Sequence, residues 1–440
     1  MPRLMVLDKE LLTQIGIEQQ RLAVFSPGMM GPASKEVLRS PVFPRNWFNS
    51  VKRLLVPGTI DNLHDLEGYQ QIIECSPALA ELDICTHKAQ SDDGIDPLYD
   101  TKDEDGTLFQ MLFSHNLGEH AQPVMALSRL LLSWVGVGYP TRTLTRVIDF
   151  SSLTALVLEH CDMVDGLLNA LADNFAGTGT ALKHFEFDGQ LRGLAPLQDF
   201  LRSISGLSSL HVFYSLRKQD VGFDMACLRT HLSTLQQFFF RAEDETGFDV
   251  SEMVPAETLQ ELSEKSPNLR DLAVGMPRVR CSDVASMSWG AFDESLDISS
   301  TAQNLKTVRF TTWPLASEGS FIEDGEEDMT ATQASRLDVL MELQYHAHLD
   351  SFANAVLRRM AAVRGSSDLT RLPILLFGKA KGTTTVWDEV ERAGITVRSV
   401  TYIPTMQRST YGREEICGTR MGSDEVGYNI PKPEKGYCLF

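Results

Sequence analysis

A six-residue spacing of apolar side chains, L-x-x-L-x-L, recurs along the chain and constrains its fold more than any other feature. In "LAELDI" the three apolar positions are Leu79, Leu82 and Ile84, and the same spacing returns far downstream in "LRDLAV". The first position, three residues ahead of the second, suits a turn. The second and third positions lie two residues apart and suit one face of a strand. Full hexads begin at Val51, Leu79, Leu127, Leu153, Leu182, Leu235, Leu269 and Leu305.

Two further segments match the spacing less well. Leu210 and Phe213 start a hexad, but Ser215 stands at its third position. "LTRLPI" completes a hexad from Leu369, although it places Pro373 inside the expected strand.

The distances between neighbouring hexads are nearly constant. Longer gaps from 79 to 127 and from 235 to 269 indicate insertions or enlarged helices, and the gap from 305 to 369 predicts one hidden weak unit. The regular intervals are 28 residues from 51 to 79, then 26, 29, 28 and 25 residues between the hexads at 127, 153, 182, 210 and 235. These lengths match the period of about 20 to 29 residues that is typical of leucine-rich repeats.

Segments with helical periodicity lie between the hexads, at 162–175, 196–207, 256–267 and 334–363. Each strand and helix pair is too small to close its own core, so neighbouring pairs must stack. We therefore predict an α/β leucine-rich repeat solenoid, an irregular ribonuclease-inhibitor-like horseshoe with parallel inner strands and outer helices. The alternative is a doubly wound α/β domain, which the constant unit length and the lack of a glycine-rich strand-to-helix turn disfavour.

Composition limits the partners and the compartment. The 440 residues carry a formal charge of -19 with a pI near 5.0, which disfavours nucleic acid and favours basic protein partners. Seven scattered cysteines without a CxxC motif, and a charged N-terminus, predict a cytoplasmic or nuclear protein. The most apolar run, 124–138, is too short to span a bilayer and contains Arg129, so we predict buried core and no membrane contact.

The concave face of the predicted sheet is the expected binding surface, because residues between the buried hexad positions project from it. Tyr214, Phe239, Arg241 and Arg309 have the composition of a protein-binding hot spot. The alternative is an ordinary solvated face. The predicted protein-binding residues are Glu81, Asp83, Glu159, His184, Glu186, Tyr214, Phe239, Arg241 and Arg309.

No motif in the sequence indicates catalysis, a cofactor or a metal. The acidic stretches 91–106 and 317–329 lack a complete calcium-binding frame, and His346 and His348 lie two apart in a predicted helix, where they face different ways. "GKAKGTTT" at 378–385 lacks the Gly-Lys-Ser/Thr of a phosphate loop. We predict a non-enzymatic protein, with an enzyme or enzyme accessory on an α/β scaffold as the alternative.

The divergent hexads, the "SPNL" and "AQNL" lead-ins, the acidic interruptions and the closing "VWDEVERAGITVRSV" at 386–400 resemble the irregular repeats of fungal F-box-type leucine-rich repeat proteins. In that family the repeats hold a substrate, and an N-terminal F-box docks onto the linker subunit of a cullin-type ubiquitin ligase. The resemblance thus implies a substrate receptor, and a final helix and strand at 386–400.

The resemblance also divides the chain. It implies an N-terminal segment 1–44, a solenoid over 45–402 with the acidic insertions, and a tail over 403–440. "LDKELLTQI" at 7–15 is similar to the opening of an F-box, with Asp8 in place of proline, but the leucine spacing of the later F-box helices is missing. Residues 1–44 are therefore a working F-box, a degenerate F-box or a segment that matches by chance.

Overall fold

A computed structural model shows the chain folded into two compact units. The first comprises Met1–Leu232 and Asp244–Gly247, and the second comprises Ser233–Glu243 and Phe248–Phe440. The structure describes residues 24–25, 49–56, 69–70, 72–85, 112–113, 125–137, 147–176, 180–191, 193–216, 223–244, 254–277, 279–280, 289–312, 314, 331–378, 383–387, 394–408 and 413–421.

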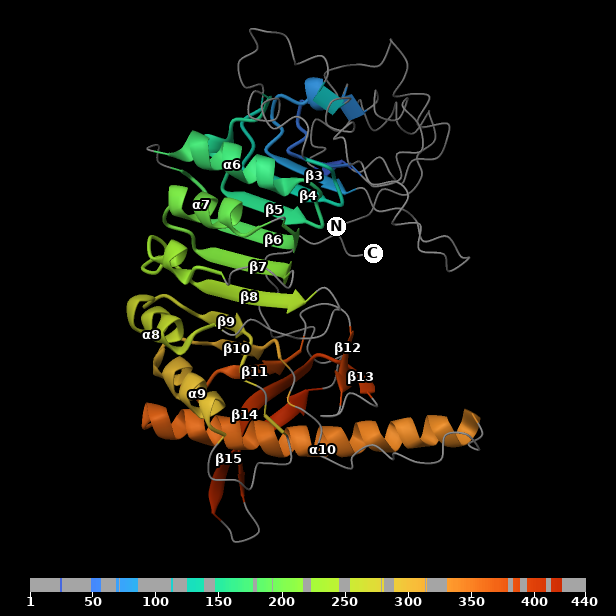
Figure 1. The fold of residues 1–440 in the computed structure, drawn as a ribbon, viewed down its shortest axis with the longest axis vertical. Coiled ribbons are helices and arrows are strands. Elements are labelled where there is room, and N and C mark those ends of the chain that lie inside the picture. The colour runs from blue at the N-terminus through green and yellow to red at the C-terminus, as the bar shows by residue number, and fades with distance from the viewer. Residues whose placement is uncertain are drawn as a thin grey trace. The chain divides into compact units, whose positions relative to one another are not determined.

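A parallel sheet forms the first unit, and its strands lie side by side in the order of the sequence (Figure 1). The neighbouring strands from β1 to β7 pair in parallel, which confirms the predicted pairing. The strands are β1 Val24–Phe25, β2 Arg53–Val56, β3 Glu81–Cys85, β4 Arg129–Ser133, β5 Ala155–Glu159, β6 His184–Gln190 and β7 Ser209–Leu216.

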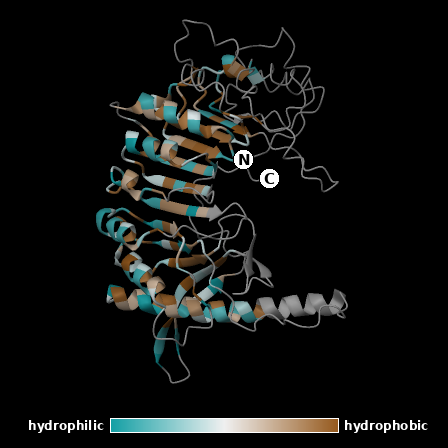
Figure 2. Cartoon of the chain, viewed as in Figure 1, coloured by the Kyte–Doolittle hydropathy of each residue, from teal (hydrophilic) through white to brown (hydrophobic). Residues whose placement is uncertain are grey.

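The hexad leucines of the first unit face a layer of helices. Helix α6, Val164–Phe175, and helix α7, Ala195–Ser203, each bury an apolar stripe. Two short 3-10 helices, η5 at Phe150–Ser152 and η6 at Met225–Leu228, also lie in segments that follow strands. Phe185 of β6 contacts Phe200 of α7, with ring centroids 4.9 Å apart. Much of the strands is hydrophobic, whereas the helices mix hydrophobic and hydrophilic residues (Figure 2). The predicted strand and helix layers are therefore confirmed.

The same backbone hydrogen bonds repeat from one unit of the solenoid to the next. The carbonyl of Ser128 accepts from the N–H groups of both Thr154 and Ala155, and the carbonyl of Thr154 accepts from those of Lys183 and His184 in the next repeat. Hydroxyl groups reinforce the pattern, because Thr154 Oγ1 donates to the carbonyl of Ser128 at 2.8 Å. These hydrogen bonds at the start of each strand thus fix its register relative to the preceding repeat.

The second unit begins with parallel strands and ends with antiparallel ones. β8 to β11 pair in parallel in sequence order, and β14 and β15 then add antiparallel strands beside β11. β12, Thr383–Trp387, and β13, Gly394–Arg398, form a separate antiparallel pair. The strands of the larger sheet are β8 Gln237–Asp244, β9 Asp271–Val274, β10 Thr307–Phe310, β11 Ile374–Phe377, β14 Val400–Arg408 and β15 Glu414–Met421.

Aromatic side chains make the core of the second unit. Phe352, on the long helix α10, Ala331–Arg364, contacts Phe292 on α9, Ala291–Thr301, with centroids 5.5 Å apart. It also contacts Phe377 of β11 at 6.0 Å, so it joins two helices to the sheet. The remaining helices are α8, Ala256–Lys265, and the short η9, Leu369–Arg371.

Two hexads lie three residues away from their predicted positions. Leu210 pairs with Phe185 and Val212 with Phe187, so the hexad is Leu207, Leu210 and Val212. The last parallel unit likewise reads Leu372, Leu375 and Phe377, all buried. Both predictions were wrong for the same reason. The first two positions of a hexad are three residues apart, so a leucine three residues before or after the true first position also fits the pattern.

The predicted hidden unit between 305 and 369 is absent from the sheet. Val308 of β10 pairs directly with Leu375 of β11. The intervening chain instead forms α10, whose 34 residues include the helix predicted at 334–363. Between β10 and β11, the described residues thus form one long helix and the short η9, with no additional strand among them.

The C-terminal region differs from the predicted final helix and strand. Val386 and Trp387 belong to β12, so the helix does not begin at 386; residues 388–393 lie outside the described residues. The predicted strand is present as β13 and the start of β14. Part of the segment that we assigned to a tail forms the β14–β15 hairpin at the end of the sheet.

Several other predictions fall outside the described residues. These are the F-box-like stretch at 7–15 and the acidic stretches 91–106 and 317–329. None of the described helices combines the length and the apolar composition that a membrane-spanning segment requires.

Asparagines in the lead-ins connect successive repeats of the second unit. Asn268 Nδ2 donates to the carbonyl of Ser233 at 2.9 Å, and Asn304 Nδ2 donates to that of Pro267 at 2.6 Å. This explains the "SPNL" and "AQNL" lead-ins, since each amide closes the turn onto the previous repeat.

Replacing Asn304 by alanine should therefore lower the free energy of unfolding by about 1 kcal/mol, the net contribution of one such hydrogen bond. Urea unfolding followed by circular dichroism would measure the change. The adjacent exposed Gln303 gives the control, because Gln303→Ala should change stability by less than about 0.5 kcal/mol. Equal effects of the two substitutions would show that the hydrogen bond from Asn304 to the preceding repeat contributes little to stability.

Candidate functional site

The candidate site lies on the face of the first-unit sheet that points away from the helices. Side chains alternate along a strand, so the residues between the hexad positions share this opposite face. Neighbouring strands align these residues in rows; one row runs Asp83, Leu131, Val157, Glu186 and His211 across β3 to β7. All five are buried. The predicted solvent exposure of this row is therefore wrong.

Part of this face is a small second apolar core. Cys85, Leu131 and Val157 form a buried cluster, with Leu55 packed against it. β4 and β5 are thus apolar on both faces, as strands of parallel sheets commonly are. Asp83 on one side of this cluster and Glu186 on the other consequently lie next to apolar side chains.

A charge cluster occupies the β2 to β4 side of the face. Asp83 is fully buried, and its Oδ2 accepts hydrogen bonds from Arg53 at 3.0 Å through Nε and at 2.5 Å through Nη2. Arg129 Nε lies 3.4 Å from the other carboxylate oxygen. Glu81, which is half-buried, lies 3.6 Å from Arg53. Two cations from the strands on both sides therefore hold one buried carboxylate.

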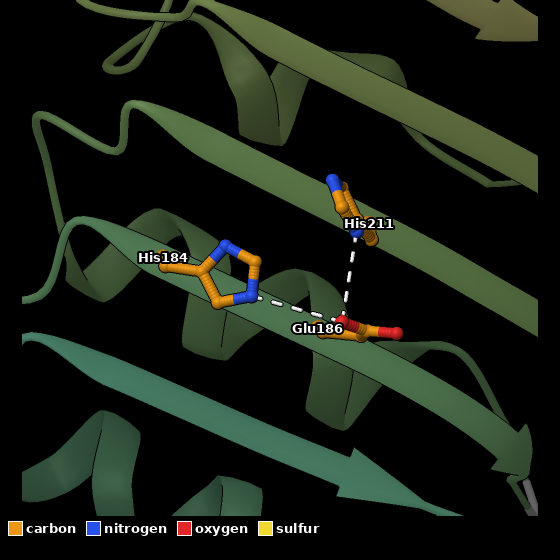
Figure 3. A group of neighbouring side chains, drawn as sticks. All are labelled: His184, Glu186 and His211. Carbon is orange, nitrogen blue, oxygen red and sulfur yellow. Dashed lines mark ion pairs between the residues drawn. The ribbon is translucent and has the colours of Figure 1, made fainter. Parts of the chain in front are cut away.

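A second polar cluster spans β6 and β7. His184 Nε2 lies 3.7 Å from Glu186 Oε2, and His211 Nδ1 lies 3.6 Å from the same oxygen (Figure 3). The two imidazole rings meet edge to face, with centroids 5.3 Å apart. Glu186 and His211 are buried and His184 is half-buried. Among the described residues, this is the group of metal-ligating side chains whose ligand atoms converge within 4.8 Å.

Ser209 extends this cluster on the far side of His211. Its Oγ lies 3.2 Å from His211 Nε2, and the side chain is buried. The order serine, histidine and glutamate is that of a hydrolase triad. However, the distance of 3.6 Å from His211 Nδ1 to Glu186 exceeds a hydrogen bond, and the sequence around Ser209 has no nucleophile motif. The arrangement suits ion binding better than nucleophilic catalysis.

A third group, the end cluster, lies where β4, β5 and β6 end, and consists of Trp134, Glu159, His160, Met163 and Asp188. The rings of Trp134 and His160 lie 4.5 Å apart, and His160 Nε2 lies 3.8 Å from Asp188 Oδ2. Trp134, His160 and Met163 have φ of 60°, 50° and 59°, a left-handed conformation that is uncommon outside glycine. The end cluster therefore holds aromatic and apolar side chains on strained backbone.

The thiol pKa values of two buried cysteines in the first unit agree with a structural role for these residues. Burial raises the pKa of the Cys161 thiol to about 12, and burial raises that of Cys227 to the same value. The described cysteines Cys75, Cys85, Cys161, Cys227 and Cys417 are free thiols.

The predicted binding residues of the second unit lie on the corresponding face. Phe239 and Arg309 are half-buried and Arg241 is buried. Arg309 Nη1 donates to the carbonyl of Gly378 at 3.1 Å, and burial lowers the pKa of this guanidinium to about 10. These three residues are therefore less exposed than their composition suggested.

Tyr214 leaves the predicted site because of the corrected register. It lies two residues from Val212, on the face of the buried hexad residues, and its ring is 6.3 Å from Phe223. The same correction brings His211 beside Glu186, a contact that the sequence analysis missed. The alignment of Leu207 with its neighbours was the signal that could have revealed it.

The repeating register, the parallel strands and the outer helices define the chain as a leucine-rich repeat-type α/β solenoid. No model of a known protein family and no curated protein matches the sequence. Among solved structures, the chain is similar to the leucine-rich repeat-containing protein LegL7 from Legionella pneumophila, with 13% identity and a TM-score of 0.31, over 78% of this chain and 97% of that chain.

Proposed function

We propose that this chain is a non-enzymatic protein-binding repeat protein, and that the end cluster is its principal contact surface. The observation that carries the proposal is the left-handed backbone at Trp134, His160 and Met163. Such conformations cost free energy and persist where function requires a particular side-chain placement.

The composition of the end cluster supports a protein partner. Tryptophan and methionine are enriched at protein interfaces, and Met163 is 42% exposed. A half-buried Trp134, whose ring is tilted by 38° against that of His160, offers a rigid apolar surface that loses little conformational entropy on binding. The ring pair therefore fits an anchor around which a partner packs.

Charge favours a basic segment as the partner. Glu159 and Asp188 lie side by side in the register of β5 and β6, and the Asp188 side chain is 40% exposed. The chain as a whole carries a formal charge of -19. A lysine or arginine side chain would meet both carboxylates and the face of Trp134, which adds a cation–π contribution. Of the residues predicted from sequence, Glu159 is central to this surface, and Glu81 and His184 lie on the same sheet face.

The finer proposal is that the bound protein is a substrate for ubiquitination. It rests on the resemblance of the repeats to F-box-type proteins and on the F-box-like stretch at 7–15. In that role, residues 1–30 would contact the linker subunit of a cullin-type ligase while the end cluster holds the substrate.

Selection from a displayed library of random linear peptides tests the contact surface. We expect enrichment of peptides rich in lysine and arginine, because the surface is acidic and aromatic. Trp134→Ala should weaken binding of a selected peptide by about 30-fold, which corresponds to a hot-spot loss of about 2 kcal/mol. Fluorescence anisotropy with the full-length chain measures the affinity.

Charge-matched variants give the control for this experiment. Glu159→Gln with Asp188→Asn should weaken binding by about 10-fold, since two carboxylates at the contact are lost. Asp173→Asn with Asp199→Asn removes the same charge from the helix layer and should leave the affinity unchanged. Equal loss in both double variants, or selection of acidic peptides, would contradict the proposed surface.

Affinity purification tests the ligase role separately. The full chain should recover a cullin-ligase linker subunit, and a chain lacking residues 1–30 should not. Recovery that is independent of these residues, or failure of the full chain to recover the subunit, argues against a receptor role while leaving the peptide-binding result intact.

A further inference from the structure

We propose that His184, Glu186 and His211 bind one zinc-class divalent metal ion. The three side chains come from two adjacent strands and converge on one point of the sheet face, as Figure 3 shows. This inference is independent of the protein-binding proposal, because none of the three residues belongs to the end cluster.

The strand geometry explains why the three ligands meet. His184 and Glu186 are two residues apart on β6, so both project from the same face. His211 stands directly opposite Glu186 in the parallel register of β7. The hydrogen-bonded sheet thus holds all three Cα atoms in place, and only side-chain rotation is needed to form the site.

The distances are close to those around a bound ion. In a tetrahedral zinc site, metal–ligand bonds of about 2.0–2.1 Å place the ligand atoms about 3.3 Å from one another. Glu186 Oε2 lies 3.7 Å from His184 Nε2 and 3.6 Å from His211 Nδ1. The ligand nitrogens of the two imidazoles lie within 4.8 Å of each other, and His184, the most exposed ligand at 29%, can rotate to close this gap.

The donor set selects the class of ion. Two imidazole nitrogens and one carboxylate oxygen are typical of zinc sites with three protein ligands and an open fourth position. Calcium and magnesium prefer oxygen ligands, so this group disfavours them. The fourth position would be filled by water or by a group of a bound molecule.

Ser209 supports the site as a positioning residue. Its Oγ lies 3.2 Å from His211 Nε2, the ring nitrogen that faces away from Glu186. If Nε2–H donates to this hydroxyl, Nδ1 is unprotonated and its lone pair is available to the metal. Ligating histidines commonly donate their other N–H in this way, which fixes the tautomer.

The surroundings make a bound cation favourable. Glu186 is 5% exposed and aligns with the apolar Val157 on the neighbouring strand. Burying a carboxylate beside an apolar residue is costly, and a divalent cation would offset that cost. Asp188, two residues farther along the same face, adds negative potential next to the site.

Titration of the metal-free full-length chain with Zn²⁺ and with Co²⁺ tests the inference. We expect one ion per chain, a rise in thermal stability with Zn²⁺, and the visible absorption of tetrahedral Co²⁺ without sulfur-to-cobalt charge transfer. The cobalt spectrum needs no variant and distinguishes histidine and carboxylate ligands from the free cysteines.

Variants then assign the ligands. Glu186→Gln and His211→Ala should each lower the Zn²⁺ affinity by about 100-fold or more, and Ser209→Ala by about 10-fold, as expected for an outer hydrogen-bond partner. Glu186→Gln keeps the side-chain shape, so its folding can be verified by circular dichroism. His160→Gln is the matched control, since His160 pairs with Asp188 but belongs to no convergent group of three among the described residues.

Three results would overturn the metal site. They are the absence of stoichiometric Zn²⁺ binding by the wild-type chain, a cobalt spectrum dominated by sulfur ligation, and unchanged affinity in Glu186→Gln and His211→Ala. Labelling of Ser209 by a fluorophosphonate would point instead to the hydrolase alternative.

Discussion

Replacing Asp83 by asparagine should destabilise the chain by about 3 kcal/mol, because it removes the carboxylate that pairs two arginines in the interior of the sheet face. Asp83 is fully buried, whereas the side chains of Arg53 and Arg129 are 29% and 19% exposed. Their partial exposure lets water compensate for some of the lost pairing, so we expect the lower end of the range for a broken buried ion pair. Urea unfolding followed by circular dichroism measures the loss.

Two controls distinguish the buried pair from a general charge effect. Glu81→Gln removes a half-exposed carboxylate near the same Arg53 and should cost less than about 1 kcal/mol. Asp83→Leu together with Arg53→Met and Arg129→Met removes the buried carboxylate and both of its arginine partners, and it continues the apolar row of Leu55 and Leu131, so it should recover much of the stability. An equal effect of Asp83→Asn and Glu81→Gln would show that burial of Asp83 contributes little.

Replacing Phe352 by alanine should lower the free energy of unfolding by about 3 to 5 kcal/mol, the usual cost of emptying a buried phenylalanine site. Phe352 is fully buried, and its ring lies 5.1 Å from that of Trp289 and 5.5 Å from that of Phe292. It also contacts Phe377, so the cavity would open between α9, α10 and β11.

The same helix offers a matched control. Leu343 is also on α10 but is 58% exposed, so Leu343→Ala should change stability by less than about 0.5 kcal/mol. Phe352→Leu retains most of the apolar volume and should cost less than about 1.5 kcal/mol. Similar losses from Phe352→Ala and Leu343→Ala would mean that α10 is held by contacts other than this aromatic core.

The solenoid was predictable because its cause is local and repeated. Leu82 and Ile84 are buried by the same packing that buries Leu130 and Leu132, so the spacing alone identifies the strands. The prediction failed where the pattern can be shifted by three residues, as at Leu210. There only pairing with β6 decides which residues face the helices.

The candidate sites could not be predicted from the sequence, because they are formed by contacts between different repeats. Glu186 and His211 are 25 positions apart in the chain, and nothing in either hexad indicates that they are opposite each other. Asp83 was predicted as an exposed binding residue, yet arginines from both neighbouring strands hold it in the interior. Trp134 and His160 lie just past their strands, where a hexad pattern makes no prediction.

The amino-acid sequence by itself determined the repeat, the parallel strands and the outer helices, because these follow from short-range spacing and from the need of each small unit to bury its leucines against the next. The tertiary structure alone decided which polar side chains meet. Sheet register brings together residues of different repeats, and their partners determine whether a carboxylate is solvated, paired with arginines or placed between two imidazoles.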